Sequence, residues 1–221
     1  WIEKSSLSAV VIFPSSASLH SETPTAYQPF VDAIVRSGRA CLVPLSPGTF
    51  SRQGTVHGMS ASEQREVLIE MSQDLSRSID YLESRVDIDA SRLAFWGYSL
   101  GSRFSPVFDA VDDRFAANVM VAGGLYQGGE FFTIRPSLPE YDPFHFAPRS
   151  YTPAIMINGR HDFLRPVDTH QVPLLQLLGA PDEDKKHVLF DSGHAPPQIG
   201  VIRETLSWLD LYLGPVEKIR N

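Results

Sequence analysis

Short apolar runs alternate with amphipathic segments along the whole 221-residue chain. Six runs have the length and composition of buried strands, at residues 8–13, 40–45, 93–96, 116–121, 153–158 and 187–190. Apolar residues recur at helical spacing between them, at residues 25–37, 61–85, 102–111, 172–178 and 199–213. Because parallel neighbours need crossover connections, this alternation predicts an α/β fold with a mostly parallel central sheet of about six strands and helices on both faces.

The length of the chain limits how many domains it can form. Its 221 residues, 43% of them apolar, are enough for one substantial core and too few for two ordinary enzyme domains. We therefore expect one domain over residues 1–221, with no large cap domain. The first residue is Trp1 and not Met, which favours a piece trimmed from a longer product with a covalent link to an upstream domain.

Charge and cysteine content exclude several functions. The net charge is −7 and no basic block is present, so we expect no nucleic-acid partner. No apolar run approaches the roughly 20 residues that span a bilayer, so we expect no membrane span. The single Cys41 excludes an intrachain disulfide, and no H-E-x-x-H or calcium-loop pattern occurs, so no metal and no cofactor are implied. The sequence is compatible with a cytoplasmic, a periplasmic or an exported location.

A five-residue motif, Gly97-Tyr98-Ser99-Leu100-Gly101, separates a predicted strand from a predicted helix. G-x-S-x-G in that context is the pattern of a nucleophile elbow, a sharp turn that lifts a serine hydroxyl clear of the backbone. Such a turn needs small residues two positions before and two positions after the serine, and both are glycine here. The helix that follows would point free amide groups at a developing oxyanion. The motif predicts that Ser99 is a nucleophile.

A serine hydroxyl is a poor nucleophile until a base removes its proton, and enzymes with this elbow supply the partners in the order Ser, Asp or Glu, His. Asp162 follows the fifth predicted strand and His194 follows the sixth. We expect His194 to act as general base and then general acid, and Asp162 to orient the imidazole. Asp168 is the rival acid, although its position suits a helix cap.

The six other histidines have simpler interpretations than catalysis. His187 is expected in a strand, and His145 and His161 are expected to support the site. The others are expected in loops or at helix ends, namely His20, His57 and His170.

An oxyanion hole needs two backbone donors, one usually from the residue after the nucleophile and one from the loop after the first core strand. The first is Leu100. In the loop after the first core strand, Pro14 has no amide hydrogen, so the second donor is Ser15 or Ser16, and the sequence does not choose between them.

A long segment between the fourth and fifth strands, residues 122–152, has no clear period and is rich in Gly, Pro and aromatic residues. Long loops in compact domains are usually functional. We expect its aromatic residues, with the tyrosine of the motif, to bind substrate: Tyr98, Tyr126, Phe131 and Phe132.

With these residues the chain resembles the α/β-hydrolase superfamily, within its dienelactone hydrolase-like and acetyl xylan esterase-like group. It is also similar to the hydrolase domain at the carboxyl end of some bacterial multidomain serine/threonine protein kinases. The resemblance covers nearly the whole chain and is carried by residues 11–14 (VIFP), 37–40 (SGRA), 74–83 (DLSRSIDYLE), 158–163 (NGRHDF) and 204–216 (ETLSWLDLYLGPV).

The resemblance implies a Ser-Asp-His triad, which maps onto Ser99, Asp162 and His194. Dienelactone hydrolases proper use a cysteine nucleophile, so a serine here points to ordinary ester substrates. Such relatives usually carry a glycine in the loop after the first strand, where this chain reads Pro-Ser-Ser-Ala. The chain also begins only seven residues before its first core strand, without the two strands that often open this fold.

Three functions follow as hypotheses. The first is hydrolysis of small-molecule carboxylic esters with small or medium acyl groups, through an acyl-enzyme. The second is a peptidase or carbon–carbon bond hydrolase that uses the same triad, since fold does not determine reaction. The third is a non-catalytic regulatory module of a larger protein such as a kinase, and an intact triad argues against it.

Overall fold

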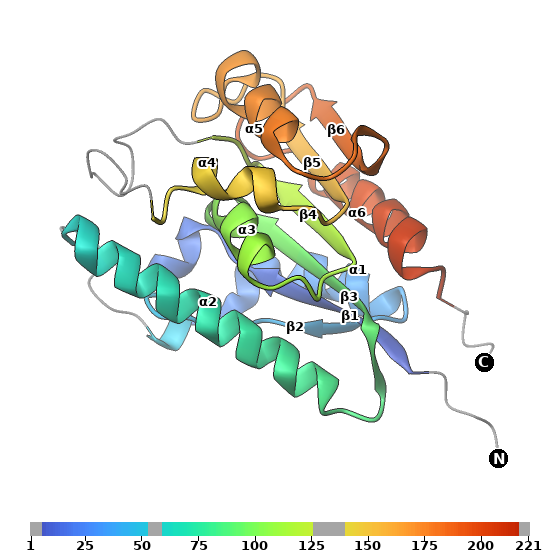
Figure 1. Ribbon diagram of the computed structural model, residues 1–221. Coiled ribbons are helices and arrows are strands. Elements are labelled where there is room, and N and C mark those ends of the chain that lie inside the picture. The colour runs from blue at the N-terminus through green and yellow to red at the C-terminus, as the bar shows by residue number, and fades with distance from the viewer. Residues whose placement is uncertain (1–5, 53–58, 126–139, 217–221) are drawn as a thin grey trace.

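The structure is a computed structural model that describes residues 6–52, 59–125 and 140–216, and it contains one six-stranded sheet (Figure 1). The strand order is β2-β1-β3-β4-β5-β6, and every neighbouring pair is parallel. The strands are β1 (Leu7–Phe13), β2 (Ala40–Leu42), β3 (Ile88–Tyr98), β4 (Ala117–Val121), β5 (Ala154–Gly159) and β6 (Lys185–Phe190). The predicted α/β architecture with a six-stranded parallel sheet is confirmed.

Helices cover both faces of this sheet. The α-helices are α1 (Gln28–Arg36), α2 (Ala61–Glu83), α3 (Leu100–Val111), α4 (Pro143–Phe146), α5 (Val172–Leu177) and α6 (Gln198–Leu213). Short 3-10 turns are η1 (Ser16–His20), η2 (Pro24–Tyr27), η3 (Phe50–Arg52), η4 (Ala147–Arg149) and η6 (Asp182–Asp184), and η5 (Val167–Gln171) is a π-helix. Figure 1 shows α2, α3 and α5 in front of the sheet, with α1 and α6 packed on its other face. No separate cap domain lies over the described part of the chain.

Alternation along β1 shows how the two faces are filled. Val11 and Phe13 pack toward α2 and α3, whereas Val10 and Ile12 pack toward α1 and α6. All four side chains are fully buried, as expected for a strand covered on both faces. This central strand ends immediately before the loop that was expected to contribute to the oxyanion hole.

Several element boundaries differ from those predicted. β3 begins at Ile88 because that residue pairs with Leu7 of β1, so the polar stretch before Leu93 is also strand. β2 spans only three residues, at the edge of the sheet, where it pairs with β1 alone. The aperiodic segment 122–152 contains α4, whose first turn is capped by the side chain of Asp142.

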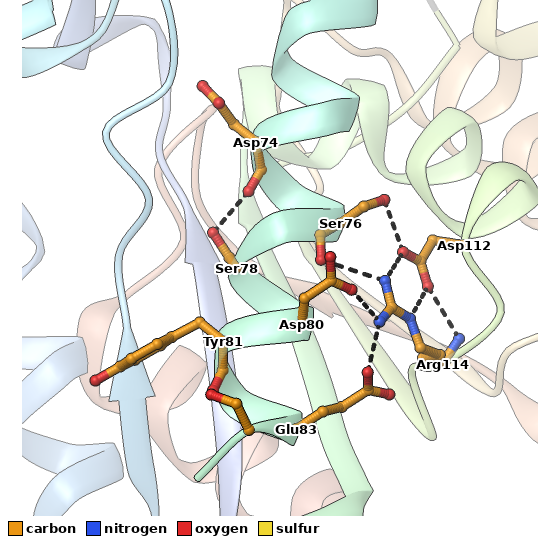
Figure 2. A network of polar contacts seen from close by, with 9 residues as sticks. Asp74, Ser76, Ser78, Asp80, Tyr81, Glu83, Asp112 and Arg114 are labelled. Atoms are coloured by element: carbon orange, nitrogen blue, oxygen red, sulfur yellow. Dashed lines mark hydrogen bonds and ion pairs between the residues drawn. The ribbon is translucent and has the colours of Figure 1, made fainter.

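An arginine-centred network holds α2 against the segment between α3 and β4 (Figure 2). The Arg114 guanidinium donates to Asp112 over 2.6 and 2.8 Å, to Asp80 over 2.7 Å and to Glu83 over 2.9 Å. The Ser76 hydroxyl donates over 2.8 Å to Asp112 Oδ2, the oxygen that also accepts from Arg114 Nη2. This network joins the carboxyl-terminal half of α2 to the residues between α3 and β4.

Candidate active site

The residues predicted from the sequence to form a triad meet at one edge of the sheet. Ser99 lies between β3 and α3, Asp162 lies in the loop after β5, and His194 lies in the loop after β6. All three loops follow the carboxyl ends of parallel strands. The three side chains therefore converge although they are far apart in sequence.

The turn at Ser99 is tight and has strained backbone. Ser99 adopts φ 51° and ψ −94°, a region that residues with a Cβ rarely occupy. A Cβ on Gly97 would lie 2.6 Å from the carbonyl carbon of Gly101, and a Cβ on Gly101 would lie 2.3 Å from the carbonyl oxygen of Phe13. Only glycine fits at both positions. The Ser99 N–H donates to the Val121 carbonyl over 2.8 Å, which ties the strained residue to β4.

A chain of hydrogen bonds joins the three side chains. Ser99 Oγ lies 2.9 Å from His194 Nε2, and His194 Nδ1 lies 2.7 Å from Asp162 Oδ2. The other oxygen of the carboxylate accepts the backbone N–H groups of Leu164 and Arg165 over 2.9 and 3.1 Å. Burial by itself would raise the pKa of Asp162, but the hydrogen bonds and the charge of His194 outweigh it and lower that pKa. Asp162 is therefore ionised at neutral pH and able to orient the imidazole.

A buried glutamine that the sequence did not single out supports the acid loop. Gln171 is fully buried, and its Nε2 donates to the carbonyls of Gly159 and Arg165 over 3.1 and 2.6 Å. These two carbonyls flank the loop that carries Asp162. Gln171 closes the π-helix η5, an irregular form often found at functional sites. No local pattern distinguishes such a glutamine from one on an ordinary helix, because its role depends on the loop opposite.

The hydrogen bonds described for the triad side chains do not involve the rival acid or the other histidines. Asp168 is exposed on η5, and it is Asp162 that reaches His194. His161 and Asp191 form an exposed pair 2.6 Å apart, between Nε2 and Oδ1. The remaining described histidines lie in β6 (His187), α4 (His145), η1 (His20) and η5 (His170), and His57 lies outside the described residues. Among the described residues no cluster of His, Cys, Asp or Glu could hold a metal ion.

The backbone donors expected for an oxyanion hole lie on two adjoining segments. Leu100 is the first residue of α3, so its N–H has no acceptor within the helix. In the loop after β1, the Ser15 N–H donates to the hydroxyl of Tyr27 over 2.7 Å. The Gly101 N–H donates to the Pro14 carbonyl over 3.0 Å, which holds the start of α3 against this loop.

The residues expected to bind substrate are only partly described. Tyr126, Phe131 and Phe132 lie outside the described residues. Tyr98 is half-buried and packs beside Trp96 at 6.0 Å between ring centroids, on the sheet face covered by α1 and α6. Burial, with the nearby Tyr27 and Asp162, raises the pKa of Tyr98.

An apolar cavity lies beside Leu100, between the amino-terminal turns of α2 and α3. Its apolar lining comes from Leu19, Met59, Val67, Leu68, Met71, Leu100 and Phe104. Of the described residues in the segment 122–152, Tyr141 lines this cavity.

Among the described residues no helix is long and apolar enough to cross a bilayer.

No protein-family model and no curated protein matches the sequence, but solved structures do. TT1662 from Thermus thermophilus is 16% identical with a TM-score of 0.76, over 95% of this chain and 90% of that one. A protein assigned as a dienelactone hydrolase from Klebsiella pneumoniae subsp. pneumoniae is 17% identical with a TM-score of 0.70, over 94% and 88%. An acetyl xylan esterase from Paenibacillus sp. R4 is 17% identical with a TM-score of 0.71, over 95% and 76%.

These likenesses, which extend over nearly the whole chain, agree with the resemblance seen in the sequence. The chain therefore has the α/β-hydrolase fold, in the form found in dienelactone hydrolase-like and acetyl xylan esterase-like structures.

Proposed function

We propose that this protein is a serine hydrolase that cleaves small-molecule carboxylic esters with small to medium acyl groups. One observation carries the proposal: the hydrogen-bond chain from Ser99 through His194 to Asp162, which starts at a strained serine on a strand-to-helix turn. A nucleophile touching a base that is oriented by a buried carboxylate is the arrangement of acyl-transfer catalysts. Solved structures of the same fold include an acetyl xylan esterase, which agrees with this chemistry.

In the proposed reaction, Ser99 Oγ attacks the ester carbonyl carbon while His194 Nε2 accepts the hydroxyl proton. Asp162 holds the Nδ1–H of the imidazole and stabilises its charged form. The carbonyl oxygen gains the negative charge, and the backbone N–H of Leu100 is one donor to it. Collapse of the tetrahedral intermediate breaks the ester C–O bond, and the leaving alcohol takes the proton from His194.

The acyl-enzyme is then hydrolysed by the same residues. His194 Nε2 accepts a proton from water, whose oxygen attacks the acyl carbon and forms a second tetrahedral intermediate. Its collapse releases the carboxylic acid and returns the proton to Ser99 Oγ. The apolar cavity is lined in part by Leu100, whose N–H is the proposed oxyanion donor, and this supports placing an aliphatic acyl chain there.

A fluorophosphonate probe tests the nucleophile directly, because it phosphonylates only an activated serine. We expect the wild-type protein to be labelled, Ser99→Ala to be unlabelled, and Ser84→Ala, which changes an exposed serine after α2, to be labelled as the wild type is. Failure of the folded wild-type protein to label would refute the proposal and favour a non-catalytic module.

An ester series then tests the substrate class. p-Nitrophenyl esters of increasing acyl length should be hydrolysed with a preference for short or medium chains, and peptides should not be cleaved. Turnover of peptides without turnover of esters would favour a peptidase that uses the same triad.

A further inference from the structure

We propose that Tyr27 is a positioning residue for ester hydrolysis, which engages the Ser15 N–H and so leaves the Ser16 N–H as the second oxyanion donor. This inference rests on the proposed function and concerns the same site. It resolves the choice between Ser15 and Ser16 that the sequence left open, and it assigns a role to a tyrosine outside the triad.

The hydrogen bonds of the loop after β1 can be accounted for donor by donor. Pro14 has no N–H. The Ser15 N–H donates to Tyr27 Oη over 2.7 Å, and the Ala17 N–H donates to Ser15 Oγ over 3.2 Å. The Ser18 N–H donates to the Ser15 carbonyl over 3.1 Å. Within the described structure only the Ser16 N–H of this turn is left without a protein acceptor, so it is available to donate to a substrate oxygen.

The same turn touches the helix that supplies the other donor. The Gly101 N–H donates to the Pro14 carbonyl over 3.0 Å, and the Gly101 Cα approaches β1 so closely that a Cβ there would meet the Phe13 carbonyl oxygen at 2.3 Å. Leu100 directly precedes Gly101, and Ser16 is two residues after Pro14. The two unengaged N–H groups, of Leu100 and Ser16, therefore belong to segments in direct contact beside Ser99.

Tyr27 is well placed to hold this turn rigidly. It ends η2, is 4% exposed, and its ring meets Phe50 edge-on with centroids 6.3 Å apart. Its hydroxyl lies 2.7 Å from the Ser15 nitrogen and 2.6 Å from Ser15 Oγ, so it contacts the turn at two points. Burial raises the pKa of Tyr27, so the hydroxyl keeps its proton and serves as both acceptor and donor. The turn is thus anchored to the start of α1.

Loss of this anchor should affect the transition state more than substrate binding. In Tyr27→Phe the Ser15 N–H loses its acceptor, and the turn is free to rotate so that this N–H finds water. The Ser16 N–H then moves away from the position of the oxyanion. Removing an oxyanion donor outright costs about 10²–10³-fold in kcat, and small displacements of a positioned group cost up to about 10²-fold.

The experiment compares Tyr27→Phe with the wild type in p-nitrophenyl ester hydrolysis and in inhibition by an alkylboronic acid, whose adduct with serine is tetrahedral. We expect kcat to fall by about ten- to a hundredfold, KM to stay within about twofold, and the boronate Ki to rise by a factor similar to the fall in kcat. A purely structural role would lower the melting temperature without this split between kcat and KM. Tyr212→Phe is the matched control, because its hydroxyl bonds Asp184 away from the site at 2.8 Å.

A second pair of variants tests the donor itself. Ser16→Ala keeps the backbone N–H and should retain near-normal kcat, whereas Ser16→Pro removes it and should lower kcat by about 10²–10³-fold. An active wild type together with unchanged kcat in Tyr27→Phe, or equal activity in the two Ser16 variants, would overturn the inference alone. A wild type that neither hydrolyses esters nor labels at Ser99 would overturn the proposed function, and the inference with it.

Discussion

Replacing Asp162 with asparagine is the sharpest test of the proposed acid. One carboxylate oxygen accepts the N–H groups of Leu164 and Arg165, and the other lies 2.7 Å from His194 Nδ1. An asparagine can keep its carbonyl oxygen on the two backbone donors. Its NH₂ group then faces Nδ1 and can only donate. The imidazole must therefore carry its proton on Nε2, which faces Ser99 and can no longer accept a proton.

The expected loss follows from that change of tautomer. In a Ser-His-Asp triad the amide substitution lowers kcat by about 10⁴-fold while the geometry survives. At about 1.36 kcal/mol per factor of ten, this corresponds to roughly 5 kcal/mol of lost transition-state stabilisation. The fold should persist, because both backbone donors of the 162 loop keep an acceptor and Gln171 still bonds the carbonyls on either side of it.

The assay is steady-state hydrolysis of a p-nitrophenyl ester, with circular dichroism to verify the fold. Asp168→Asn is the matched control, since that carboxylate is exposed on η5. We expect it to leave kcat within about twofold, in keeping with the small effects typical of surface substitutions. If Asp162→Asn retained kcat within tenfold, or if Asp168→Asn caused the large loss, the assignment of the acid would be refuted.

Further predictions concern pH and packing. Activity should be lower in acid than at neutral pH, because only a neutral imidazole can accept the Ser99 proton, whereas Asp162, whose pKa is lowered, stays ionised; a rate that does not change with pH would contradict this. Asp109→Ala should lower the free energy of unfolding in urea by about 2–4 kcal/mol, because it leaves the buried Ser150 hydroxyl unpaired and the Thr152 hydroxyl with only the Phe115 carbonyl at 3.3 Å, and Asp109→Asn should cost less. Because burial raises the pKa of Asp109, its contribution to stability should decrease as the pH rises above 3.8. Gly101→Ala should abolish labelling at the elbow and lower the melting temperature, since its methyl would meet a β1 carbonyl at 2.3 Å.

Much of the fold could be predicted from the sequence because its signals are local. The apolar runs of β1, β4 and β5 are short enough to be strands. A long apolar stripe indicates α2, and a capping box between Ser60 and Glu63 stabilises its first turn. The elbow motif is also short, and Gly97 is required by backbone atoms of Gly101 and Ser102, although Gly101 is required by the carbonyl of Phe13 on β1, which is distant in sequence. Parallel crossovers then place the loops with Asp162 and His194 at the same edge as Ser99.

Only the tertiary structure decided how these loops are held. It placed Asp162 rather than Asp168 against His194, engaged the Ser15 N–H with Tyr27, and set Gln171 across the acid loop. A glutamine or tyrosine in a short helix looks the same in sequence whether its polar end meets water or a loop from a distant strand. Secondary structure follows from the sterics and periodicity of neighbouring residues. Hydrogen bonds between distant segments depend instead on where the crossovers bring them, which no local pattern encodes.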